Sequence, residues 1–380
     1  MIKTIFKILV GLLAGGLLGL LLGGLIVVVF TDTTWAEYIA KYYTIDFSEG
    51  LAVVLVAITS LIVSFFILVT LHELGHLVCG LLTGYKFVSF RIFNYTFFKQ
   101  DGNFRIKKFA IPGTGGQCLL APPDLPVKDM RTGWYNFGGI FANIIVLVIA
   151  LPFFFLDLKP FVAEALGVFV ATDAFIILIN GIPMRAGGVG NDAYNMILLR
   201  RNLLSKRGIV CQLRANALIQ SGMRPKDMPE ELFSNPDEID YSNALEVSIP
   251  LMYASRLVDM AEYEEAKTLF ESLYSHKEEI MPLYVNEIAC ELSFLYLRTG
   301  EIDKAERLLD KNLRKYITAY KAMMSSKMRL LSAIYLYLEH DETKATEIYR
   351  QLKAREEEYL LQGEVRGDIA LVEDMLKNRK

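Results

Sequence analysis

The sequence predicts an all-α polytopic membrane domain with about four transmembrane helices and a small β-hairpin, followed by a soluble α-helical repeat domain. Charge is distributed unevenly over the 380 residues: 1–200 contain 14 Lys and Arg and 12 Asp and Glu, whereas 201–380 contain 26 and 31. Long apolar runs occur in the first half, and helix-break-helix segments recur in the second. We therefore expect a membrane domain at 1–200, a linker at 201–240 and a cytoplasmic helical domain at 241–380.

Four apolar segments predict the membrane spans, at 8–30, 51–82, 134–156 and 161–182. The first is longer than the core of a signal peptide and no small-residue cleavage site follows it, so we interpret it as a retained span. The segment at 84–132 carries eight Lys and Arg. The positive-inside bias therefore places this segment and both termini in the cytoplasm.

A β-hairpin is expected between the second and third spans. Residues 87–98 are rich in aromatic and β-branched side chains, and Asp101-Gly102 is a turn signal. Residues 104–107 alternate between apolar and basic side chains. We expect the aromatic side chains to reach the membrane interface or the helix bundle, and an exposed hairpin edge is able to pair with an extended peptide. The glycine-rich stretch at 113–123 is interpreted as a flexible connector.

Near its end, the second span contains the motif H-E-x-x-H at residues 72–76. On a helix, His72 and His76 project from the same face, as two ligands of one zinc ion must. Glu73 is placed to act as a general base. The alternative is a pair of structural helix-face histidines beside a solvated glutamate. Ionisable groups inside a membrane are costly and usually mark function, which favours the zinc interpretation.

A zinc protease needs a third protein ligand and an open fourth position. The other two histidines, His276 and His340, fall in the predicted helical domain, so the third ligand is expected to be a carboxylate. Asp173 and His72 lie at nearly equal depth, given a rise of about 1.5 Å per residue. Asp192 follows the fourth span and reaches the site only if its loop folds back. Physical reasoning leaves both residues as candidates for the third ligand. Asp173 could equally be a hydrogen-bonded structural carboxylate, and Asp192 could equally be an ordinary carboxylate that favours the dipole at a helix N-terminus.

Three motifs in the first half resemble the site-2 protease family of intramembrane zinc metalloproteases. The resemblance covers about residues 50–200. In chain order, the motifs are His72-Glu73-Leu74-Gly75-His76, then Gly138-Gly139-Ile140-Phe141-Ala142-Asn143, then Asn180-Gly181-Ile182-Pro183 followed by Asn191-Asp192-Ala193. Two features depart from the family pattern: the spacing from Pro183 to Asp192 is longer than the commonest one, and Ala193 replaces the usual glycine. Both departures concern the Asp192 assignment.

The resemblance implies a complete active site with Zn²⁺ as its cofactor. Its residues are the metal ligands His72, His76 and Asp192, the general base Glu73, and the substrate- or oxyanion-binding Asn143 and Asn180. Amide donors suit the last role. The implied activity is hydrolysis of peptide bonds in membrane-spanning or membrane-adjacent substrates near the cytoplasmic face. The implied setting is a lipid bilayer, which the resemblance and the compact architecture identify as a bacterial cell membrane.

The second half contains three similar segments about forty residues apart, at 253–270, 292–309 and 334–349. Each has an apolar helix, a break and an alanine-centred helix, and they resemble degenerate tetratricopeptide repeats, which offer a surface for a protein partner. The acidic excess gives no reason to expect nucleic-acid binding. The alternative function is a non-catalytic membrane scaffold that acts through these repeats.

Overall fold

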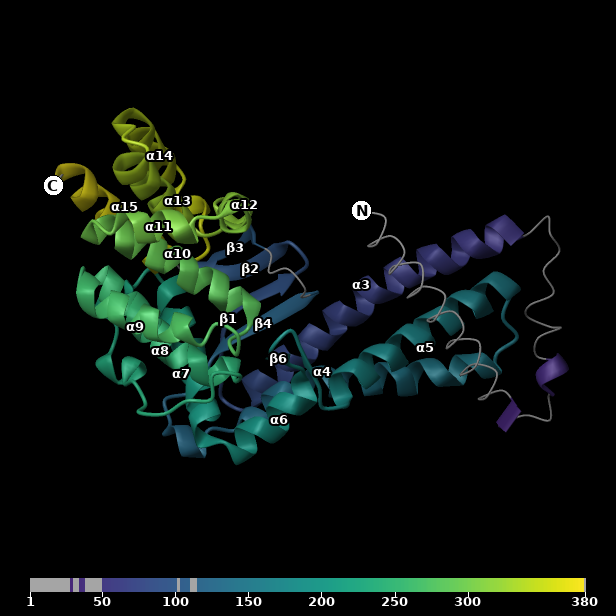
Figure 1. Ribbon diagram of the computed structural model, residues 1–380. Helices are drawn as coiled ribbons and strands as arrows, with labels where there is room; N and C mark the ends of the chain where they lie inside the picture. Colours follow the sequence, from purple (N-terminus) through teal and green to yellow (C-terminus); the bar gives the residue numbers. More distant parts are fainter. Residues whose placement is uncertain (1–27, 30–33, 38–49, 101–102, 110–114, 379–380) are drawn as a thin grey trace. The chain divides into compact units, whose positions relative to one another are not determined.

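The computed structural model (Figure 1) describes most of the chain in five stretches. These are 28–29, 34–37, 50–100, 103–109 and 115–378. The predicted span at 8–30 lies outside the described residues except for Val28 and Val29.

The chain forms two compact units. The membrane unit comprises the residues up to 83, 133–184 and 191–196, and the helical unit comprises 84–132, 185–190 and 197–380. Two segments of the helical unit therefore interrupt the membrane unit in sequence. They are the sheet region at 84–132 and the two-stranded hairpin at 185–190.

Within the described residues, three helices are long and apolar enough to cross a membrane. They are α3 (Gly50–Leu82), α4 (Thr132–Ala150), which continues as the 3-10 helix η2 (Leu151–Phe155), and α5 (Pro160–Gly181). They correspond to the second, third and fourth predicted spans. Many of their apolar side chains, including Ile62, Val148 and Phe175, are exposed, as expected of helices that face lipid.

Glycines bring α3 and α4 into backbone contact. A Cβ added at Gly75 would collide with the carbonyl oxygen of Gly138, and a Cβ at Gly138 would collide with that of Gly75. Small residues allow such close approach between membrane helices. The contact holds the H-E-x-x-H face of α3 against α4.

The region between α3 and α4 forms an antiparallel sheet in the order β3-β2-β1-β4. Its strands are β1 (Lys86–Ile92), β2 (Tyr95–Gln100), β3 (Asn103–Lys108) and β4 (Gly116–Ala121). The predicted hairpin is present, but 87–98 contains a turn at Phe93-Asn94 and so forms two strands. The expectation of a flexible connector at 113–123 is wrong, because β4 pairs with β1 and buries 118–120.

In the described part of the helical unit, each of the three recurring sequence segments spans the break of one helix pair (Figure 1). The pairs are α8 (Ala244–Asp259) with α9 (Tyr263–Ser275), α10 (Pro282–Thr299) with α11 (Ile302–Leu308), and α13 (Ser325–Ala333), extended by the π-helix η5 (Ile334–Leu338), with α14 (Glu342–Ala354). The break in each pair has one residue of positive φ, namely Ala261, Gly300 and His340. The second helix of each pair buries one alanine completely, namely Ala266, Ala305 and Ala345.

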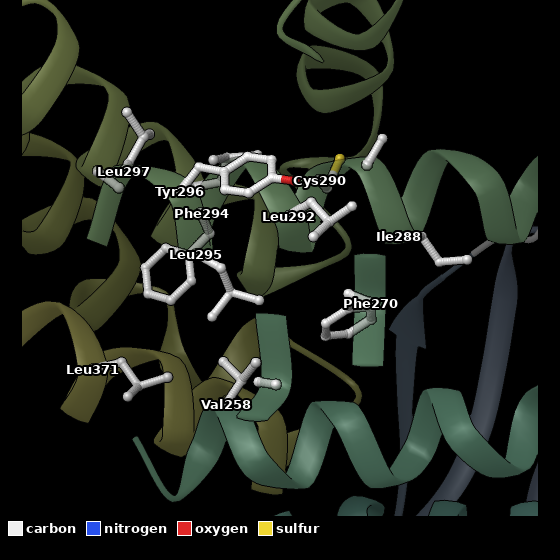
Figure 2. Packing of buried hydrophobic residues seen from close by; sticks show 14 of the residues in the cluster. Val258, Phe270, Ile288, Cys290, Leu292, Phe294, Leu295, Tyr296, Leu297 and Leu371 are labelled. Atoms are coloured by element: carbon white, nitrogen blue, oxygen red, sulfur yellow. The ribbon is translucent and has the colours of Figure 1, made fainter. Parts of the chain in front are cut away.

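The remaining described elements lie outside these pairs. They are η1 (Val127–Asp129), β5 (Arg185–Ala186), β6 (Val189–Gly190), α6 (Asp192–Arg201), α7 (Leu203–Gln220), η3 (Pro225–Asp227), η4 (Glu230–Phe233), α12 (Lys311–Tyr320), η6 (Glu356–Glu358) and α15 (Gln362–Lys377). Part of the stretch predicted as a linker, 201–240, thus forms a helix that packs on α8. Figure 2 shows the apolar core of the helical unit, where Phe270, Leu292 and Leu295 are buried.

Candidate metal centre

The two motif histidines lie together on the buried face of α3. His72 and His76 are 7% and 8% exposed, and their ring centroids are 4.8 Å apart. Their Nε2 atoms are 3.2 Å apart. As the four-residue spacing on a helix predicts, both rings present their Nε2 atoms to one point. Glu73 follows His72 on the helix and is half-buried.

The opposite nitrogens of both rings are held by oxygen acceptors. The Nδ1 atom of His72 lies 2.7 Å from Oδ1 of Asn143, and the Nδ1 atom of His76 lies 2.7 Å from the carbonyl oxygen of Tyr135. Both oxygens accept, so each Nδ1 donates its proton. Each Nε2 then carries a lone pair, which is the tautomer that binds a metal. The Tyr135 contact uses a backbone oxygen, so no residue type in the sequence signals it.

Asp192 supplies a third donor at the same point. Its Oδ2 atom lies 3.0 Å from Nε2 of His72 and 3.3 Å from Nε2 of His76. The ligand atoms of the three side chains all lie within 4.8 Å of one another.

Asn191 turns the chain back so that Asp192 reaches the histidines. Its Nδ2 donates to the carbonyl oxygens of Ile179 and Ile182, each at 2.6 Å. Its Oδ1 accepts from the backbone N–H groups of Tyr194 at 2.9 Å and Met184 at 3.2 Å. The contact with Tyr194 caps the start of α6. The other three contacts join the end of α5 to the start of α6, and sequence reasoning did not find them.

Because Gly139 on α4 has no side chain, a space remains in front of the two imidazoles. A Cβ at this position would lie within 3.0 Å of the Nε2 atoms of both His72 and His76. Any side chain would therefore occupy the point on which the three donors converge. Two neutral imidazoles and one carboxylate around an open point fit a zinc ion with a free fourth position.

Replacing Gly139 with alanine is expected to weaken zinc binding by at least about tenfold, because the added methyl group displaces both imidazoles. Zinc affinity measured by competition with a chromogenic chelator checks this. Gly133→Ala is the matched control, since a Cβ there would meet nothing within 4 Å. Equal affinities in the two variants would show that the space at Gly139 is not part of the metal site.

Asn143 and Asp173 lie behind His72. The Nδ2 atom of Asn143 donates to Oδ1 of Asp173 at 2.7 Å, and both side chains are completely buried. The second oxygen of Asp173 has no hydrogen-bond partner among the residues that the structure describes. Asp173 thus contacts Asn143 and lies outside the convergent set of donors. The amide of Asn143 is committed to His72 and Asp173, and its substrate or oxyanion role stays a prediction.

Asn180, the other predicted substrate-binding residue, lies near the end of α5. Its Nδ2 donates to the carbonyl oxygen of Ile176 at 3.0 Å, within the same helix. Its role in substrate binding also stays a prediction.

Comparison with known proteins identifies one family. The model of peptidase family M50 matches residues 60–353, a range that includes both histidines, Glu73 and Asp192. A search of curated proteins found no match, and neither did a search of solved structures.

Proposed function

The chain belongs to peptidase family M50, the site-2 protease family of membrane metalloproteases, and from this premise we propose that it is an intramembrane zinc metalloprotease. Its proposed substrates are membrane-spanning or membrane-adjacent polypeptides, cut near the cytoplasmic face. The observation that carries the proposal is the convergence of His72, His76 and Asp192 on the space that Gly139 leaves open.

The residues of the site divide the chemistry between them. Zinc held by His72, His76 and Asp192 would polarise a peptide carbonyl and make water more acidic. Glu73 accepts the proton of the attacking water and delivers it to the amine of the leaving segment. Asn143 orients His72 through Nδ1, and Asp173 orients Asn143 in turn.

The proposed substrate must change conformation before it is cut. The carbonyl groups of a membrane helix are hydrogen-bonded and shielded, so the segment has to unwind. An unwound segment is able to pair with an exposed strand edge. β3 is one of the two edge strands of its sheet, and its side chains Phe104 and Ile106 are 73% and 60% exposed. These features support β3 as a place where an extended substrate pairs.

We assign the helical unit a recruiting or regulatory role, with a protein partner. The equivalent positive-φ residue and the equivalent buried alanine in each of the three helix pairs support the tetratricopeptide-like interpretation. Both termini are proposed to lie in the cytoplasm, from the basic segment at 84–132. The bacterial origin is proposed from the family resemblance and the compact architecture. A scaffold without catalysis would need no convergent ligand set, so the metal centre favours the protease.

Metal removal tests the proposal directly. The purified chain in lipid vesicles is incubated with a panel of single-span peptides, and the products are identified by mass spectrometry. We expect cleavage near the cytoplasmic end of a span, loss of cleavage after treatment with a zinc chelator, and its return when zinc is added back. Cleavage that persists without metal would contradict the proposed chemistry, and a scaffold would cleave no peptide under either condition.

A further inference from the structure

A cavity of about 200 Å³ lies inside the helical unit. Its walls come from α7, α8, α10 and α15 and from the loops around η3 and η4. Part of the wall is apolar, with Ile219, Phe233 and Leu251 among its side chains. The polar part comprises Gln212, Asn216, Ser248, Ser255, Tyr284 and Glu364. An apolar wall with a few convergent polar groups is typical of a small-ligand site.

Glu364 is the one acidic residue among the described residues that line this cavity. It makes no hydrogen bond and no ion pair in the described part of the chain, whereas the charged residues next to it are paired. A carboxyl group that lines a partly apolar cavity without a counter-ion is costly when ionised. A ligand that supplies the missing charge would remove this cost.

The charged neighbours of Glu364 are themselves unbalanced. Lys327 Nζ pairs with Oε2 of Glu287 at 2.8 Å. Arg329 pairs with Glu291 at 2.5 Å and with Oδ1 of Asp368 at 3.3 Å. Two cations thus face three carboxylates, so this cluster has a net charge of −1 before Glu364 is counted and −2 once Glu364 is ionised. The field of this cluster therefore favours a cation beside Glu364. Arg256, whose guanidinium lies 4.7 Å from the ring centroid of the cavity-lining Phe233, is a cation outside this cluster.

The same surroundings affect the titration of Glu364. Burial first, and then the carboxylates of Asp368, Glu287 and Glu291, raise its pKa to about 8, against a smaller opposing effect of Lys327. The carboxyl group is therefore mostly protonated at neutral pH. A bound cation stabilises the ionised form, so its binding releases a proton.

We propose that this cavity binds the protonated amine of a ligand with a short apolar chain, and that Glu364 is the counter-ion of that amine. The apolar wall accommodates the methylene groups, and the hydroxyl and amide oxygens of Ser248, Ser255 and Asn216 are acceptors for the remaining N–H groups. A lysine side chain and a free alkylamine share this chemistry. The proposal does not depend on the protease activity, because no residue of the metal centre lines the cavity.

The test uses the full-length chain in detergent with two cationic probes, n-pentylammonium and N-acetyl-lysine-N-methylamide, and with 1-pentanol as the neutral counterpart. Ligand-observed saturation-transfer NMR gives each dissociation constant. We expect the parent to bind a cationic probe about tenfold more tightly at pH 9 than at pH 7, because the ionised fraction of Glu364 rises by that factor while the probe stays protonated. Glu364→Gln should abolish cation binding, and Glu373→Gln, on the same helix but outside the cavity, should leave it unchanged.

The outcomes of this test distinguish a lysine side chain from a free amine as the ligand, and both from the absence of a cation site. Binding of the lysine derivative supports the proposal with a peptide side chain as the source, and binding of pentylammonium alone supports it with a free amine. Equal binding of 1-pentanol, unchanged cation binding in Glu364→Gln, or failure of the parent to bind either cation would overturn it.

Folding of the variant is checked in the same preparations. The folded-state pKa of Glu364 lies above its ordinary value of 4.5, so the group contributes stability below that value and the contribution is lost as the pH rises through about 8. Glu364→Gln should therefore have a higher thermal midpoint than the parent at pH 9. A lost ligand response in a variant with a higher midpoint is then a binding effect.

Discussion

Replacing Glu73 with glutamine is expected to lower the rate of peptide hydrolysis by roughly 10²- to 10⁴-fold, the usual contribution of a general base. Glutamine has nearly the shape of glutamate but cannot accept the proton of the attacking water. Zinc binding should survive, because Glu73 is not among the three convergent donors. The measurement is the initial rate of cleavage of a single-span peptide that the parent cleaves, together with the zinc content of the same preparation.

The chain offers a matched control for this substitution. Glu164 is a carboxyl-bearing residue of α5, another membrane helix, and it lies outside the convergent donor set, so Glu164→Gln should keep the parent rate. A parent-like rate in Glu73→Gln would exclude Glu73 as the base. If hydrolysis is lost but the cellular phenotype of the protein is unchanged, the chain works as a scaffold, and its helical unit carries the function.

The sequence was sufficient to place the two histidines. A spacing of four residues at the end of an apolar run, of which 51–70 contain no charged residue, predicts two imidazoles on one face of a membrane helix. The predicted span at 51–82 agrees closely with α3 at Gly50–Leu82. Periodicity and hydropathy act locally along the chain, so they predict the helix and the face without knowledge of any other element.

The third metal ligand could not be identified from its depth along a membrane span, because Asp192 lies on α6, outside the spans. Depth along a span favoured Asp173, which the structure places behind Asn143. Asp192 reaches the histidines through a turn that the Asn191 side chain builds with four backbone groups. Such a turn depends on the position of the end of α5, which no local pattern encodes.

The sheet shows the same limit of local reasoning. β4 is flanked by glycines and prolines, which are turn signals, and its partner β1 lies far away in sequence. The pairing that makes it a strand is therefore invisible in the local pattern. The turn at Phe93-Asn94 was also missed, because Phe93 adopts a positive φ of 50° and an aromatic residue seldom does so.

The zinc content of two variants should separate the candidate third ligands. The parent in detergent is expected to hold about one zinc per chain, and Asp192→Ala to lose it, since two imidazoles alone leave the site short of a ligand. Asp173→Ala should still bind about one zinc when the metal is in excess. Its affinity should fall by roughly 10- to 100-fold, because it removes the support of Asn143 and thereby of His72. Metal analysis after dialysis, followed by competition with a chelator, measures both effects.

Other zinc contents in these variants would contradict the proposed ligand set. Zinc lost from Asp173→Ala but kept by Asp192→Ala would give the third position to Asp173, and the contact between Asp192 and the imidazoles would then be an ion pair. No zinc in a well-folded parent would remove the basis of the protease proposal. Asn191→Ala distinguishes a ligand from its support, because it keeps the Asp192 carboxylate but removes the side chain that turns it towards the histidines. It should therefore weaken zinc binding less than Asp192→Ala does.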